Sequence, residues 1–192
     1  MTVVDGQTRD GRTRRGERNR EAIIDALIAC YEDGTLRPSV QEVADRAGVS
    51  ARSVHNHFAD VETLRAEVAQ RQWLKCAPFT VPLDRDRPVP ERVAQLVELR
   101  SALFEEVTPV RRAALLSVHR SPTIAANLGH LDRRLRRQVE RAFDLDADAL
   151  DAVDALASWD AWNRLRGAQG CSVARARRVL TTSIRTVVEG AA

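Results

Sequence analysis

The sequence predicts an all-α protein of about nine helices. Apolar residues recur at steps of three and four along most of the chain, and Ser, Thr or Asp precedes many of these runs in the position of a helix cap. Only 4% of the residues are aromatic and the β-branched clusters are short, which disfavours a sheet. A chain of 192 residues can bury a core without metals or disulfides, as one domain or as a small and a medium one.

The first part of the chain predicts an arm followed by four helices. Residues 1–17 carry three glycines, several arginines and little to bury, so we expect a flexible basic arm. Cap residues then mark the helices, and the clearest case is Ser39 with Glu42 three positions later as a capping box. The expected helices run from Arg18 to a stop at Gly34, from Ser39 to Gly48, over 51–58, and from a cap at Asp60 to Trp73.

The second part of the chain predicts five more helices after a linker. Four prolines between residues 78 and 90 disfavour a helix there, so this stretch is expected to connect the two halves. The helices expected after it run over 90–104, 109–118, 122–143, 147–167 and 173–187. The first of them has an apolar face made of Val93, Leu96, Val97, either Leu99 or Arg100, Leu103 and Phe104.

The last two expected helices suggest a dimer. The helix at 146–165 is apolar on more than one side, with Leu150 and Val153 on one face and Leu156 and Trp159 spread to another. A helix with one solvent-exposed face needs only one apolar stripe, on the face that packs against the core. We therefore expect a homodimer formed through the helices at 146–165 and 172–188.

Composition excludes several classes of protein. The 30 basic and 27 acidic residues leave a net charge of only +3, and the longest run without a charged residue, 121–131, is far shorter than the ~20 residues of a membrane span. Residues 1–20 lack the apolar core of a secretory signal. The three cysteines are too far apart to suggest a disulfide framework. We expect a cytoplasmic protein that does not enter a membrane.

Residues 39–58, SVQEVADRAGVSARSVHNHF, carry the most specific motif. Small Ala44 falls where two short helices would cross, and Gly48 opens a three-residue turn that needs positive φ. Val49 would fill the space under the turn, and Val54 would anchor the second helix. This pattern predicts a DNA-binding helix-turn-helix, whose second helix enters the major groove. An ordinary corner between two helices is the alternative.

The motif and its context resemble the TetR family of transcriptional regulators (TetR/AcrR-like). The matching pieces are EVADRAGVS, then Val54, His57 and Phe58, then Glu62 and Leu64 in the next helix, within about residues 15–70. The resemblance implies a DNA-binding domain at 18–60, an effector-binding and dimerisation domain at 61–192, and repression of an operator. His55 and Val61 depart from the family, which usually has Tyr and often Lys there to contact phosphates.

The candidate DNA contacts come from the arm and the two helices of the motif. Residues 9–20 hold six arginines against Asp10 and Glu17, so a basic arm beside the recognition helix can follow the DNA backbone. Arg52 suits guanine and Asn56 suits adenine. The alternatives are a solubilising tail, a solvated arginine, and a packing role for His57. The full candidate set is Arg14, Arg15, Arg18, Ser39, Gln41, Ser50, Arg52, Ser53, His55, Asn56 and His57.

The second domain is expected to hold a small-molecule effector of unknown identity between its helices. The candidate lining residues are Trp73, Leu99, Leu103, Phe104, His119, Trp159 and Trp162, and for each of them the alternative is a plain core position. We expect no enzyme activity, cofactor or metal, because the sequence contains no catalytic or nucleotide-binding motif. Two alternatives remain. One is an adaptor of the same fold that has lost DNA binding. The other is a helical metal-dependent enzyme using the acidic residues between 144 and 151.

Overall fold

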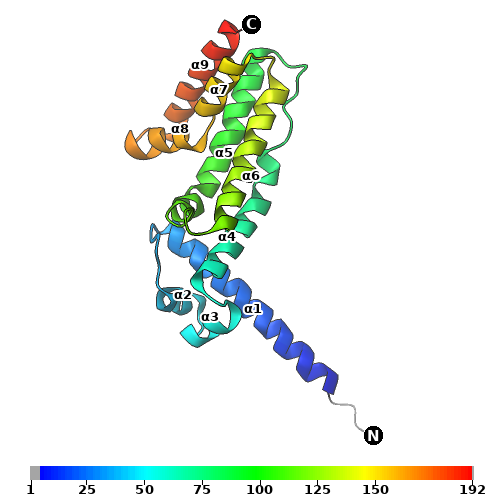
Figure 1. The fold of residues 1–192 in the computed structure, drawn as a ribbon, viewed down its shortest axis with the longest axis vertical. Coiled ribbons are helices and arrows are strands. Elements are labelled where there is room, and N and C mark those ends of the chain that lie inside the picture. The colour runs from blue at the N-terminus through cyan, green and yellow to red at the C-terminus, as the bar shows by residue number, and fades with distance from the viewer. Residues whose placement is uncertain (1–4, 192) are drawn as a thin grey trace. The chain divides into compact units, whose positions relative to one another are not determined.

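The computed structural model describes the backbone of residues 5–191 and the side chains of residues 13–191. Over this part of the chain it is all-helical, with nine α-helices, one short 3-10 helix and one π-helical turn (Figure 1). The prediction of an all-α protein of about nine helices is confirmed. The α-helices are α1 (Asp5–Glu32), α2 (Val40–Ala47), α3 (Ala51–His57), α4 (Val61–Lys75), α5 (Val89–Leu115), α6 (Pro122–Ala142), α7 (Ala147–Leu156), α8 (Trp159–Asn163) and α9 (Val173–Gly190).

The chain divides into two compact units. The first comprises Met1–Gln72 and Pro109–Ile124, and the second comprises Trp73–Thr108 and Ala125–Ala192. Each unit has its own apolar core. This division differs from the expected boundary at residue 60, and it places the stretch at 78–90 inside the second unit rather than between two halves.

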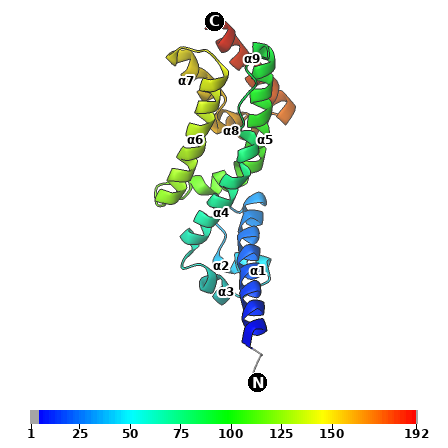
Figure 2. The same cartoon turned by 90° about the vertical axis from the view of Figure 1, so that its right-hand side faces the viewer.

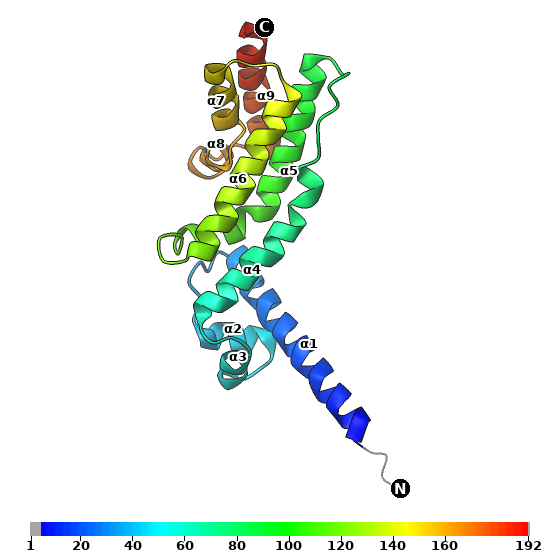
Figure 3. The same cartoon turned by 45° about the vertical axis from the view of Figure 1, so that its right-hand side comes forward.

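The first unit is built around α1. Figures 1 and 3 show α2 and α3 packed beside the middle of this long helix. The buried side chains of α1 fall at helical spacing and meet those of the next three helices. The core consists of Ile23, Ile24, Ala26, Leu27, Tyr31, Val43, Ala44, Val54, Phe58, Leu64, Val68, Val110 and Ala113.

The second unit packs α7, α8 and α9 against α5 and α6. Figure 2 shows α7 beside α6 and α9 beside α5, and side-chain hydrogen bonds join both pairs, Arg136 to Asp151 and Arg177 to Ser101. The segment at 78–90 contains the end of the 3-10 helix Ala77–Phe79 and then an irregular stretch that buries Leu83. Among the described residues no helix is long and apolar enough to cross a membrane.

Three element boundaries differ from the sequence-based expectation. Helix α1 begins at Asp5, so residues 5–17 are helical where a flexible arm was expected, and the first four residues of that arm lie outside the described part. Once a helix has formed, each added residue gains a hydrogen bond, so continuation does not require an apolar face. The other two differences are that α5 continues through Pro109 and that the helix expected at 146–165 is broken between α7 and α8.

Candidate functional site

The helix-turn-helix begins with a complete capping box. The Ser39 hydroxyl accepts a hydrogen bond from the backbone N–H of Glu42 at 3.2 Å, and the Ser39 N–H donates to the Glu42 carboxylate at 2.7 Å. The Glu42 carboxylate accepts from both the backbone and the hydroxyl of Ser39, which lowers the pKa of Glu42 below its usual value. This exchange satisfies donors that helix α2 would otherwise leave unpaired.

The turn between α2 and α3 has the geometry that the sequence predicts. Gly48 adopts φ 67° and ψ 30°, a left-handed conformation that costs glycine little, and its N–H donates to the carbonyls of Ala44 and Asp45. The N–H of Val49 also donates to Ala44, at 3.0 Å. Ser50 then caps α3 by accepting from the N–H of Ser53. The chain therefore turns within three residues, and fully buried Ala44 allows close packing.

Helix α3 is anchored by two apolar side chains and by a framework of ion pairs. Val54 and Phe58 are buried in the core of the first unit. The Arg20 guanidinium lies 5.0 Å from the centre of the Phe58 ring and forms a two-point pair with Glu67 at 2.7 and 3.3 Å, which joins α1 to α4. Arg71 of α4 pairs with Asp25 at 2.6 Å and with Glu21. These ion pairs join α1 to α4, and Arg20 also packs on the ring of Phe58 at the end of α3.

The exposed face of α3 presents Arg52, His55 and Asn56. Arg52 lies three positions before His55 and four before Asn56, so the three side chains lie on one side of the helix, away from buried Val54. Among the side chains that the structure describes, none forms an ion pair or hydrogen bond with any of the three. This face therefore carries donors that remain available to another molecule.

The other predicted contacts in the motif are placed less favourably for base reading. The hydroxyls of Ser39 and Ser50 are exposed but serve as helix caps, and Gln41 donates to Asp45 at 2.6 Å. Ser53 is half-buried, while its backbone completes the Ser50 cap. His57 is also half-buried, and its ring lies 3.8 Å from the position that a Cβ would take on Gly16. That close approach agrees with a packing role for His57 against α1.

The predicted arm residues Arg14, Arg15 and Arg18 lie on α1. All three are exposed, and Arg14 and Arg18 are four residues apart on one face. Because α1 continues into the buried residues of the core, these guanidinium groups are carried by an ordered helix.

The predicted effector-binding residues do not all come together. In the second unit, Leu103, Phe104, Trp159 and Trp162 are buried in one core cluster, and half-buried Trp73 and Leu99 pack against it. His119 is exposed and belongs to the first unit, so it is not part of that cluster. Periodicity places a residue on a helix face, but it does not show with which helices that face packs.

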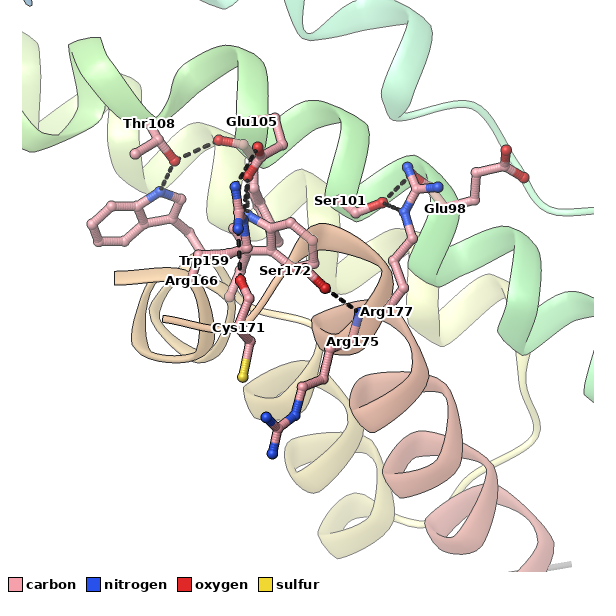
Figure 4. A network of polar contacts seen from close by, with 12 residues as sticks. Glu98, Ser101, Glu105, Thr108, Trp159, Arg166, Cys171, Ser172, Arg175 and Arg177 are labelled. Carbon is pink, nitrogen blue, oxygen red and sulfur yellow. Dashed lines mark hydrogen bonds and ion pairs between the residues drawn. The ribbon is translucent and has the colours of Figure 1, made fainter. Parts of the chain in front are cut away.

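The two buried tryptophans are held by polar contacts to α5, and Figure 4 shows Trp159 beside Thr108. Trp159 donates its indole N–H to the Thr108 hydroxyl at 2.9 Å, and Trp162 donates to the Glu105 carboxylate at 3.0 Å. The same carboxylate accepts two hydrogen bonds of 3.1 Å from Arg166. The Arg166 contact is the largest cause of a lowered pKa at Glu105. The contacts join the region around the π-helical turn Arg164–Ala168 to α5.

Arg100 was not among the predicted site residues, because the sequence left Leu99 and Arg100 as alternatives for one position on the apolar face of α5. The side chain is 1% exposed, and its two terminal nitrogens donate to the Gln138 side-chain oxygen at 2.7 Å and the Leu135 carbonyl at 2.8 Å. Its Nε is buried without a hydrogen-bond partner. Burial lowers the pKa of Arg100 to about 10, so the group remains charged at neutral pH. The sequence did contain one signal for this residue: a charged side chain that lies three or four positions from apolar residues on the same helix face.

Known proteins resemble this chain in structure but not detectably in sequence. No protein-family sequence profile matches it, and no curated protein sequence matches it. Solved structures do match it over most of its length. A transcriptional regulator from Rhodococcus sp. Rha1 matches with a TM-score of 0.68 at 20% identity, covering 90% of this chain and 97% of that one. A TetR-family transcriptional regulator from Streptomyces coelicolor matches with a TM-score of 0.65 at 18% identity, covering 88% and 80%.

This chain shares the fold of these solved transcriptional regulators. A third match is the complex of SmeT with triclosan, with a TM-score of 0.58 at 17% identity, covering 90% of each chain. At these identities the similarity establishes the fold and not the ligands. Within the TetR-like fold, the helix-turn-helix at 39–58 occupies the first unit, and the buried tryptophans and Arg100 occupy the second.

Proposed function

We propose that this protein is a TetR-type transcriptional regulator that binds operator DNA through α3 and releases it when a small-molecule effector binds. The observation that carries the proposal is the exposed face of α3, where Arg52, His55 and Asn56 have no partner among the described side chains. Arginine pairs with guanine and asparagine with adenine in the major groove. Repression is the output that the family resemblance favours.

The proposal includes a homodimer and an effector site in the second unit. The helices at 146–165 and 172–188 carry apolar side chains that remain partly exposed, including Leu156 on α7 and Val179 on α9, the latter 41% exposed. Two heads about one DNA turn apart would read a pseudo-palindrome. An effector changes DNA affinity only if it binds the two states of the dimer with different affinity.

The test is selection of bound sequences from a randomised duplex library, followed by fluorescence anisotropy on the selected duplex. We expect a pseudo-palindromic sequence that binds more tightly than a scrambled duplex and weakens as salt rises. The control is the R52A/N56A double variant, which should retain its helical content while losing the preference for the selected duplex. If the wild-type protein enriches no sequence, the adaptor alternative replaces this proposal.

A further inference from the structure

The charge of Arg100 is buried without a carboxylate in contact. Its hydrogen bonds go to the neutral Gln138 side chain and to the Leu135 carbonyl, and its Nε has no partner. Asp154 on α7 is the carboxylate whose charge favours ionised Arg100, but Asp154 hydrogen-bonds to Arg136 at 3.3 Å instead. Among the described residues, no acidic oxygen lies within ion-pair distance of Arg100.

Such an arrangement is costly for a purely structural side chain. A buried cation without a contacting anion loses its hydration and regains only part of it from neutral acceptors. An apolar side chain of similar size usually fills a core position at lower cost. The flanking positions on the same face of α5 are apolar and buried, namely Leu96, Val97, Leu103 and Phe104.

Gln138 links the cation to the irregular segment that follows the 3-10 helix. Its side-chain oxygen accepts from Arg100, while its amide donates to the carbonyl of Val81 and, at 3.4 Å, to that of Phe79. Gln138 is itself buried. A neutral amide oxygen thus occupies the position in which a carboxylate oxygen would form a stronger, charge-assisted bond.

We propose that Arg100 is the anchor for an anionic effector, a small monocarboxylate with an apolar tail, which takes the place of Gln138 on the guanidinium. The inference rests on the proposed function in that it names the chemical class of the effector for that regulator. A single guanidinium in apolar surroundings matches one carboxylate in charge and donor number, whereas a phosphate dianion would need more donors than this core offers. The tail would lie among the apolar residues of the α5 face.

The experiment uses the full chain and a set of matched probes. Butanoate, hexanoate, octanoate, decanoate and phenylacetate are each compared with the corresponding primary amide by thermal unfolding and by isothermal titration calorimetry. We expect at least one longer acid to bind about tenfold or more tightly than its amide, because only the acid forms a charge-assisted pair. If no acid binds better than its amide, the proposal is overturned.

Two variants locate the binding and one serves as a control. R100M should unfold at the same or a higher temperature without ligand, because it removes a buried charge, yet it should lose the preference for the acid. R100K retains the charge and should retain a weaker preference, which keeps the test valid if R100M does not fold. R137M removes an exposed arginine from α6 and should respond like the wild type. Acid preference that persists in folded R100M would overturn the proposal.

The test of acid binding and the test of the proposed regulator function can fail independently. Acid binding is measured without DNA, and duplex selection is performed without acid. A protein that selects an operator but ignores all the acids retains the regulator function and loses the anionic effector. A protein that binds an acid through Arg100 but selects no duplex retains the site and loses the regulator function.

Discussion

At the scale of single residues, the arginines of the first unit fall into two sets. Arg20, Arg46 and Arg71 are paired with carboxylates, and the pairs of Arg20 and Arg71 join α1 to α4. Arg52 on α3 has no partner among the described side chains, and the same is true of Arg15 and Arg18 on α1. Net charge does not separate these sets, because an arginine bonded to a carboxylate counts the same as one that is available to DNA.

Replacing Arg52 with alanine should weaken specific DNA binding by about 1–3 kcal/mol and relax the preference at one position of each half-site. The helix should remain folded, because the Arg52 side chain is exposed and unpaired in the described structure. Anisotropy titrations against the selected duplex and its single-position variants measure both effects. R134A, which removes an exposed arginine of α6, is the matched control. Equal DNA affinity of R52A and the wild type would show that Arg52 does not contact the DNA.

Replacing Glu105 with glutamine should destabilise the second unit by about 1 kcal/mol at neutral pH, a value reduced because water screens the partly exposed carboxylate. The pKa of folded Glu105 lies below its usual 4.5, chiefly because of Arg166. Its contribution is therefore present above about pH 4.5 and is lost as the pH falls through the lower folded value. Urea unfolding of both proteins across this range should show a difference that shrinks with acid. A constant difference would contradict the assigned role.

At the scale of elements, local signals predicted the helix-turn-helix because its stabilising contacts are local. The Ser39–Glu42 box, the left-handed Gly48 and the Ser50 cap each join residues within five positions. The continuation of α5 through Pro109 was not predicted. The proline removes a helical N–H, yet Val107 and Val110 on either side are buried. The sequence pattern does not reveal packing between residues that are distant in sequence.

The break between α7 and α8 had a local signal that was overlooked. The Ser158 hydroxyl accepts from the N–H of Ala161 at 3.2 Å, so Ser158 starts a new helix as an N-cap. Asp146 and Ser172 cap α7 and α9 with the same chemistry, each directly before the apolar run of its helix. The periodicity allowed either Leu99 or Arg100 on the inner face of α5. The burial of Arg100 and its lack of a contacting carboxylate depend on α6 and α7, which are distant in sequence.

Replacing Gly48 with alanine should destabilise the first unit by about 1 kcal/mol or slightly more, because alanine is strained at φ 67°. A Cβ at this position meets nothing within 4 Å, so the cost is conformational and not steric. Asparagine tolerates the left-handed region better, so Gly48→Asn should cost less. Urea denaturation of the wild type and the two variants gives the order of their free energies of unfolding. Equal stability of the alanine and asparagine variants would argue against left-handed strain as the cause.

At the scale of the whole molecule, the net charge of +3 averages over regions with different roles. Residues 9–20 hold six of the 30 basic residues against two acidic ones. The side chains of Arg14, Arg15 and Arg18 are exposed on α1. In a homodimer this basic segment occurs twice, so its contribution to DNA binding depends on both copies reaching one duplex. Sequence-independent attraction should then come mainly from α1, and sequence preference from α3.

Replacing Arg14, Arg15 and Arg18 together with alanine should weaken binding to all duplexes alike and leave the preferred sequence unchanged. Every phosphate that is no longer neutralised should reduce the slope of log affinity against log salt by about 0.9. Anisotropy at several salt concentrations, on the selected and a scrambled duplex, measures the slope and the preference separately. The matched control replaces three exposed arginines of α6, namely Arg133, Arg134 and Arg137. An unchanged slope would exclude α1 from the DNA interface.

The dimer itself is tested by solution mass and by duplex architecture. Sedimentation at micromolar concentration should give twice the mass of the chain, and a duplex carrying both half-sites should bind far more tightly than one carrying a single half-site, because the second head binds at a high effective concentration. Introducing a charge on the partly exposed apolar side of α9, as in Val179→Asp, should produce a folded monomer and remove this advantage. If V179D remains a dimer with full affinity for the two-site duplex, the two heads are joined through a different surface.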